Sequence, residues 1–224
     1  MENTISYFSR TDYTIIQQSE ALAAYGGKIS DLREQLLEFF NESIDAKAVV
    51  VGNSMGGLLA LELAALIPEK VEAIVASGAP GMGSMNLDIG PPKKSNKEES
   101  KEWFRDLKKQ LFVDPSCVSE QQLESLSEFF SNRRSFLNMI PLAKESDRYD
   151  ATTILPKIEC PVLLLWGDQD KVSPINPWEN VPELNSKIEI EMIKDSGHSP
   201  MIEKPKEYWK SIEGFLKSTR IQAM

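Results

Sequence analysis

The sequence of 224 residues has very few metal-binding or disulfide-forming side chains. It contains one histidine, His198, and two cysteines, Cys117 and Cys160. A single histidine excludes metal sites built from several histidines, and two cysteines are too few for a disulfide framework. We therefore expect a protein of a reduced compartment. We also assign it no metal and no cofactor.

The sequence also lacks long apolar runs and an excess of basic residues. No stretch reaches the roughly 18–20 uninterrupted apolar residues of a membrane span. The N-terminal sequence MENTISYFSRTDY has no basic segment followed by an apolar one, as a secretory signal would. The net charge of −9 disfavours binding to nucleic acid or anionic membranes. We expect a cytoplasmic protein that acts on a small molecule, without nucleic-acid or membrane partners.

The rest of the sequence alternates between strand and helix patterns. Residues 17–43 have helical spacing, and the apolar runs AKAVVVG and VEAIVAS enclose an Ala/Leu-rich helix. Two strands around a helix form a βαβ unit and imply a parallel sheet. Further strands are expected at CPVLLLWG and IEIEMI, and Pro205 begins a last helix. The pattern predicts an α/β fold with four recognisable strands, which end near Gly52, Ser77, Gly167 and Ile193.

An insertion interrupts this alternation. After Gly78 the chain is rich in glycine, proline and lysine, and three amphipathic segments follow. We therefore expect a core formed by residues 1–79 and 158–224, with a helical insert at residues 80–157.

The stretch VVVGNSMGG places a serine between a buried strand and a buried helix. This strand–Gly-x-Ser-x-Gly–helix arrangement predicts a nucleophile elbow, a tight turn that lifts the Ser54 hydroxyl above the sheet. The backbone N–H of Met55, at the start of the helix, is a candidate donor to an oxyanion.

A serine hydroxyl needs a base, and the base needs a carboxylate to fix its tautomer. The base candidate is His198, in the loop KDSGHSPMIEKP that follows the last predicted strand. The acid candidates are Asp168 and Asp170, in the turn WGDQDKVSP. Serine, aspartate and histidine follow one another in the chain order that is typical of a nucleophile-elbow hydrolase.

These three motifs, in this order, resemble the α/β-hydrolase superfamily over roughly residues 10–218. VGNSMGG is most similar to the capped branch with meta-cleavage-product (C–C bond) hydrolases, haloalkane dehalogenase-like esterases and pheophytinase-like enzymes. The resemblance implies that the acid is Asp170, the second aspartate of the G-x-x-D turn, and that residues 80–157 form a helical cap. Dehalogenases carry an aspartate and a tryptophan where this sequence has Ser54-Met55, which argues against dehalogenation.

The resemblance fails before the elbow. The family places about three or four strands there, and a His-Gly loop that supplies a second oxyanion donor. Only 53 residues precede Ser54, and none is histidine. We therefore expect a truncated core whose serine-bearing strand lies at a sheet edge. Three explanations remain open: a truncated gene product, an edge paired by a second copy or another chain, or residues 1–16 folding back over it.

Two functional hypotheses follow. The first is a serine hydrolase acting on an ester, or a C–C bond, of a small apolar or aromatic substrate, with Ser54, His198 and Asp170 as its triad. Loss of one oxyanion donor costs on the order of 10²–10³ in rate, so activity would be weak. Candidates for the substrate pocket are four aromatic residues of the insert, although packing of the cap helices onto the core is the interpretation we favour for any one of them: Trp103, Phe104, Phe129 and Phe136. The second hypothesis is a catalytically degenerate binding or assembly module.

Overall fold

A four-stranded parallel sheet forms the centre of the molecule. The computed structural model describes residues 26–83, 85–86, 96–124 and 133–222. Its strands lie in the order β1 (Ala48–Asn53), β2 (Val71–Ser77), β3 (Val162–Gly167) and β4 (Ile188–Ile193), and each neighbouring pair is parallel. The α/β fold class and the four predicted strands are confirmed.

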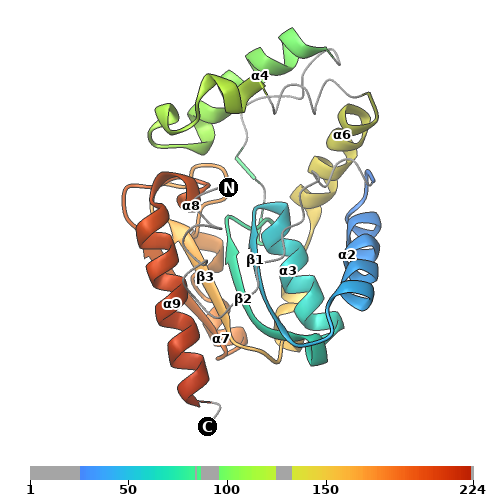
Figure 1. The fold of residues 1–224 in the computed structure, drawn as a ribbon, viewed down its shortest axis with the longest axis vertical. Coiled ribbons are helices and arrows are strands. Elements are labelled where there is room, and N and C mark those ends of the chain that lie inside the picture. The colour runs from blue at the N-terminus through green and yellow to red at the C-terminus, as the bar shows by residue number, and fades with distance from the viewer. Residues whose placement is uncertain (1–25, 84, 87–95, 125–132, 223–224) are drawn as a thin grey trace.

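Helices cover both faces of the sheet (Figure 1). Alternate residues of β2 point to opposite faces, as the pleat of a strand requires. Ala73 and Val75 pack against α9 (Pro205–Gln222), whereas Ile74 belongs to the core cluster that contains residues of α3 (Met55–Leu66). Burial on both faces explains why β2 and β3 read as nearly continuous apolar runs.

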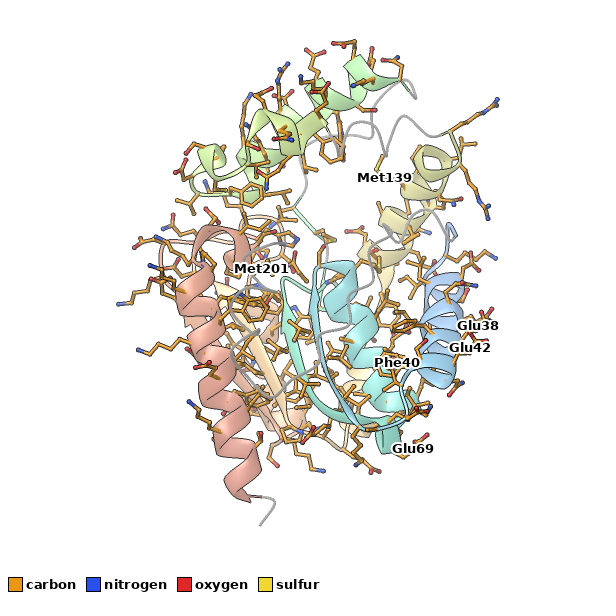
Figure 2. All side chains as sticks on the ribbon, in the orientation of Figure 1. Glu38, Phe40, Glu42, Glu69, Met139 and Met201 are labelled. Atoms are coloured by element: carbon orange, nitrogen blue, oxygen red, sulfur yellow. The ribbon has the colours of Figure 1, made fainter. Side chains whose placement is uncertain are left out.

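Helix α2 (Ile29–Ser43) packs on the outside of α3 and is amphipathic. Phe40 is buried against the core, and Glu38 and Glu42 are exposed on the outer side (Figure 2). The predicted helix of residues 17–43 is thus confirmed from Ile29 onward, and residues 17–25 lie outside the described residues. The helix begins after Gly26 and Gly27, where the Asp31 carboxylate accepts the Lys28 N–H at 3.2 Å.

The predicted insert, residues 80–157, is called the cap segment below. Its helix α4 (Lys97–Leu111) lies beyond the carboxyl ends of the strands, away from the sheet (Figure 1). Helix α6 (Arg133–Arg148) leads back towards the core, and most of the amphipathic segment between them lies outside the described residues. A small apolar cluster holds α4 to the chain that follows it, formed by Phe104, Leu107, Phe112, Val118 and Leu123. The division into core and cap remains a prediction.

Strand β1 lies at one end of the described sheet. It pairs with β2 along one edge, and its Val51 side chain is 43% exposed. Residues 1–16, one of the covers considered for its other edge, lie outside the described residues. Two short helices complete the core, α7 (Val181–Leu184) and α8 (Pro200–Glu203). Within the described part of the chain, no helix is long and apolar enough to cross a membrane.

Candidate active site

Ser54 is the single residue between β1 and α3, and its backbone is strained. Its φ of 54° and ψ of −125° lie outside the regions that residues with a side chain normally adopt. Such a conformation costs about 1–3 kcal/mol and persists only where the surroundings impose it. Here the Ser54 N–H donates to the Ser77 carbonyl at 2.7 Å, and the Ser54 carbonyl accepts the N–H of Gly57 at 2.9 Å.

Glycine is required at position 52, before the serine, because strand and helix approach so closely there. A Cβ on Gly52 would lie 2.1 Å from the carbonyl oxygen of Gly56, and one on Gly57 would lie 3.2 Å from Cβ of Ala79. Met55 is the first residue of α3. Its N–H is therefore among the donors that a helix leaves unpaired at its positive end, adjacent to Ser54.

His198 lies on the loop after β4 and is 3% exposed. Its N–H donates to the Leu111 carbonyl at 2.7 Å, and its carbonyl accepts from the Asn53 side-chain amide at 2.9 Å. The ring packs against Gly78, where a Cβ would lie 2.7 Å from Cε1 of His198. Both the backbone and the ring of this residue are thus held in place.

Asp170 holds one nitrogen of the His198 ring. Its Oδ2 lies 2.9 Å from Nδ1 of His198. Its Oδ1 accepts the N–H groups of Val172 and Ser173, each at 2.9 Å. With Nδ1 turned to the carboxylate, the proton on this nitrogen is fixed and Nε2 is left to exchange protons with another group.

Asp168 has a different environment. It is exposed, and its Oδ1 accepts the Ser196 N–H at 3.4 Å. Of the two carboxylates in the turn after β3, the structure therefore brings Asp170, and not Asp168, to the His198 ring.

The four candidate pocket residues are placed unequally. Phe104 is buried in the cap cluster, and Trp103 is partly buried beside it with ring centroids 4.9 Å apart. Phe129 and the side chain of Phe136 lie outside what the structure describes. Packing within the cap therefore accounts for Phe104, and a substrate-binding role for any of the four remains a proposal.

Sequence reasoning gave no role to Asn53 or Glu203, both of which contact the His198 loop. The Asn53 amide donates to the carbonyls of His198 and Ser77, at 2.9 and 3.2 Å, and its oxygen accepts the Ser199 hydroxyl at 3.4 Å. The one sequence feature that could have pointed to Asn53 is that an amide side chain stands directly before the elbow serine. Glu203 lies within the quoted motif SGHSPMIEKP, but two of its three partners, Val113 and Asp114, are distant in sequence.

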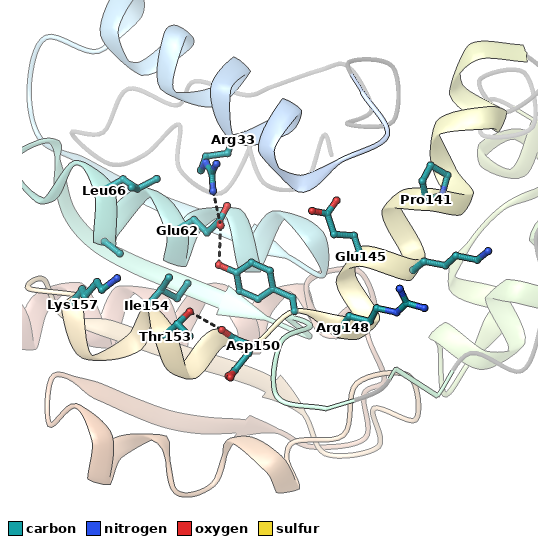
Figure 3. Close-up of a pocket in the computed structure, with 13 residues that line it drawn as sticks. Arg33, Glu62, Leu66, Pro141, Glu145, Arg148, Asp150, Thr153, Ile154 and Lys157 are labelled. Carbon is teal, nitrogen blue, oxygen red and sulfur yellow. Dashed lines mark hydrogen bonds and ion pairs between the residues drawn. The ribbon is translucent and has the colours of Figure 1, made fainter.

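A separate cavity of about 670 Å³ lies between α2, α3 and the end of α6 (Figure 3). Glu62 of α3, 3% exposed, accepts from the Arg33 guanidinium at 3.3 Å and from the Tyr149 hydroxyl at 2.8 Å. Burial, followed by the Glu62 carboxylate, raises the pKa of Tyr149. The ion pair fastens α2 to α3, and the Tyr149 hydrogen bond fastens the end of the cap segment to the same glutamate. Ser54, Asp170 and His198 do not line the cavity.

A strained serine between a strand and a helix, with an aspartate–histidine pair on later loops of a parallel sheet, is typical of the α/β-hydrolase class. The chain belongs to the alpha/beta hydrolase family, whose sequence profile matches residues 12–210. The predicted resemblance is confirmed.

Three comparisons illustrate this relationship. The chain is 27% identical over 205 residues to the dihydrolipoyllysine-residue acetyltransferase component of the acetoin cleaving system of Pseudomonas putida, covering 88% of this chain and 53% of that protein. It is 27% identical over 180 residues to 2-hydroxy-6-oxo-6-(2'-aminophenyl)hexa-2,4-dienoic acid hydrolase of Metapseudomonas resinovorans, covering 78% and 61%. The crystal structure of a membrane phospholipase A, a bacterial virulence factor, is similar with a TM-score of 0.70 and 25% identity, covering 94% and 67%. The chain spans about half the length of the curated relatives it matches.

Proposed function

We propose that the protein is a serine hydrolase in which Ser54 is the nucleophile, His198 the general base and Asp170 the residue that orients His198. The observation that carries this proposal is the buried contact of 2.9 Å between Nδ1 of His198 and Asp170, formed by the only histidine in the sequence. The strained backbone of Ser54 and the Asn53 bond to the histidine loop support it.

Each proposed residue has a defined task. Nε2 of His198 takes the Ser54 proton as Oγ attacks the carbonyl carbon, and the negative oxygen that forms is stabilised by the Met55 N–H. The resulting imidazolium is stabilised by Asp170 and returns the proton to the leaving alcohol, which departs from the acyl-enzyme. Water then attacks the acyl group in the same way, with His198 as base, and releases the acid and the free serine.

An ester of a small apolar or aromatic molecule is the substrate class that we favour. The similarity to a phospholipase A structure supports an ester. The similarity to the Metapseudomonas resinovorans hydrolase of a hexadienoic acid supports the alternative, hydrolysis of a C–C bond. In both cases a cap over the strand ends would enclose the apolar part of the substrate, with Trp103 a candidate for its lining.

Hydrolysis of short p-nitrophenyl esters tests the assignment. We expect slow turnover by the wild-type protein and none above background by Ser54→Ala or His198→Ala. Ser186→Ala, at an exposed serine in the loop before β4, is the matched control and should retain the wild-type rate. Wild-type turnover in either triad variant would overturn the proposal.

A further inference from the structure

The carboxylate of Glu203 joins two segments that are far apart in the sequence. Glu203 is the last residue of α8, five residues after His198 in the printed sequence. Its Oε1 accepts the N–H groups of Val113 and Asp114, at 2.8 and 3.1 Å. Its Oε2 accepts the N–H of Gly197 at 2.6 Å. One carboxylate therefore binds the backbone directly after α4 and the backbone directly before His198.

A second bond joins the same two segments without involving Glu203. The His198 N–H donates to the carbonyl of Leu111, the last residue of α4, at 2.7 Å. The segments are also in close steric contact, because a Cβ on Gly197 would lie 2.5 Å from the Leu111 oxygen and 3.3 Å from the Glu203 carboxylate. The end of α4 and the histidine loop thus form one hydrogen-bonded unit.

The negative charge of Glu203 acts on a residue of the cap segment, Cys117. Burial, and then the charges of Glu203 and Asp114, raise the pKa of the Cys117 thiol to about 11. Hydrogen bonds from N–H groups to a charged carboxylate are shorter and stronger than those between neutral groups. A neutral side chain at position 203 could not accept all of these bonds with equal strength.

We propose that Glu203 is a positioning residue that couples the cap segment to His198, so that a shift of the end of α4 moves the general base. The catalytic part of this inference rests on the proposed function. Substrate that draws the cap towards the core would thereby fix the orientation of His198. Movement of a catalytic group by about 1 Å can cost on the order of 10² in rate, so a modest loosening of this unit is enough to control turnover.

Amide hydrogen exchange tests the coupling without any need for activity. The His198 amide is the readout because its acceptor is Leu111 and not Glu203. In Glu203→Ala we expect this amide to exchange at least about tenfold faster than in the wild type, since the end of α4 is released. Glu203→Gln should be intermediate, because its single carbonyl oxygen can accept on only one side. Glu207→Gln, at an exposed carboxylate of α9, is the control and should leave exchange unchanged. Unchanged protection of His198 in Glu203→Ala would overturn the coupling.

Turnover of p-nitrophenyl acetate tests the positioning role. We expect kcat to fall by about 10–100-fold in Glu203→Ala while KM changes by less than about threefold, because the acetyl group is too small to need the cap. Glu203→Gln should recover part of the loss. A wild-type kcat in Glu203→Ala, with faster His198 exchange, would overturn the positioning role.

A second variant addresses the same unit with Glu203 intact. Gly197→Ala forces the histidine loop away from Leu111, and it should reproduce both the faster exchange and the lower kcat. Gly214→Ala, where a Cβ meets nothing within 4 Å, is its control. Wild-type exchange and kcat in Gly197→Ala would contradict the proposal.

A wild-type protein that turns over no ester would overturn the proposed function alone, because the exchange measurements would still decide the coupling.

Discussion

The side-chain amide of Asn53 donates a hydrogen bond of 2.9 Å to the main-chain carbonyl of His198, so the residue before the elbow serine holds the loop of the proposed base. The same amide also donates to the Ser77 carbonyl at 3.2 Å. One side chain thereby fixes the ends of β1 and β2 relative to the histidine loop.

Removal of this amide should slow turnover. We expect Asn53→Ala to lower kcat about tenfold because the loop that carries His198 loses its hydrogen bond to the residue directly before Ser54. Asn53→Asp should be slower still, since a carboxylate would face two carbonyl oxygens. Asn41→Asp, at an exposed position of α2, controls for the charge. Equal kcat values for the wild type and Asn53→Asp would show that the contact has no catalytic role.

The two aspartates after β3 should differ sharply in their effect on rate. Asp170→Asn places an amide where both carboxylate oxygens accept hydrogen bonds, and it removes the charge that stabilises imidazolium. We expect kcat/KM to fall on the order of 10³–10⁴. Asp168→Asn, at an exposed site, should cost less than about tenfold. The reverse ranking in ester hydrolysis would contradict the assignment of the acid.

Gly78 supports the His198 ring through its lack of a side chain. Its φ is +57°, and a Cβ would lie 2.8 Å from Nδ1 of His198. Gly78→Ala should displace the ring and lower kcat on the order of 10². Gly83→Ala has a positive φ of 118° but open space around its Cβ, so it should strain the backbone and leave kcat unchanged. Equal losses in both variants would point to backbone strain as the cause.

Tyr208 should make stability fall at alkaline pH. It is fully buried, its hydroxyl lies 3.1 Å from Oγ of Ser77, and burial raises its pKa to about 12. The unfolded chain therefore loses this proton at lower pH than the folded protein, and the contribution of Tyr208 is complete below pH 10 and decreases towards pH 12. The free energy of unfolding, measured in urea, should be lower at pH 11 than at pH 8. This decrease should be larger for the wild type than for Tyr208→Phe, by on the order of 1 kcal/mol. An equal decrease in both proteins would contradict this.

Three of the strands were predictable because each is a short, mostly apolar run that reaches a glycine or serine, as at Gly52 and Gly167, and the fourth because apolar residues alternate with glutamate in IEIEMI. The elbow was predictable because its requirements for small residues are local. Helix α3 begins at Met55, as the elbow arrangement predicted, and includes Gly56 and Gly57 despite their low helix propensity.

Contacts between distant segments could not be predicted from local patterns. The partner of Asn53 is 145 residues away, and Val113 is 90 residues from Glu203. Nothing in the spacing of either residue indicates that the end of α4 meets the histidine loop. The choice of Asp170 over Asp168 came from the family resemblance, because the sequence of the turn alone allowed both.

Labelling with a fluorophosphonate probe tests the central claim most directly. The Ser54 oxygen should bond to phosphorus with loss of fluoride, and peptide mass spectrometry should locate the adduct on Ser54 in the wild type. Ser54→Ala should remain unlabelled, and Asp170→Asn should react much more slowly. A folded wild-type protein that stays unlabelled, or equal labelling of Ser54→Ala, would contradict the account and favour a hydrolase-like binding module without catalysis.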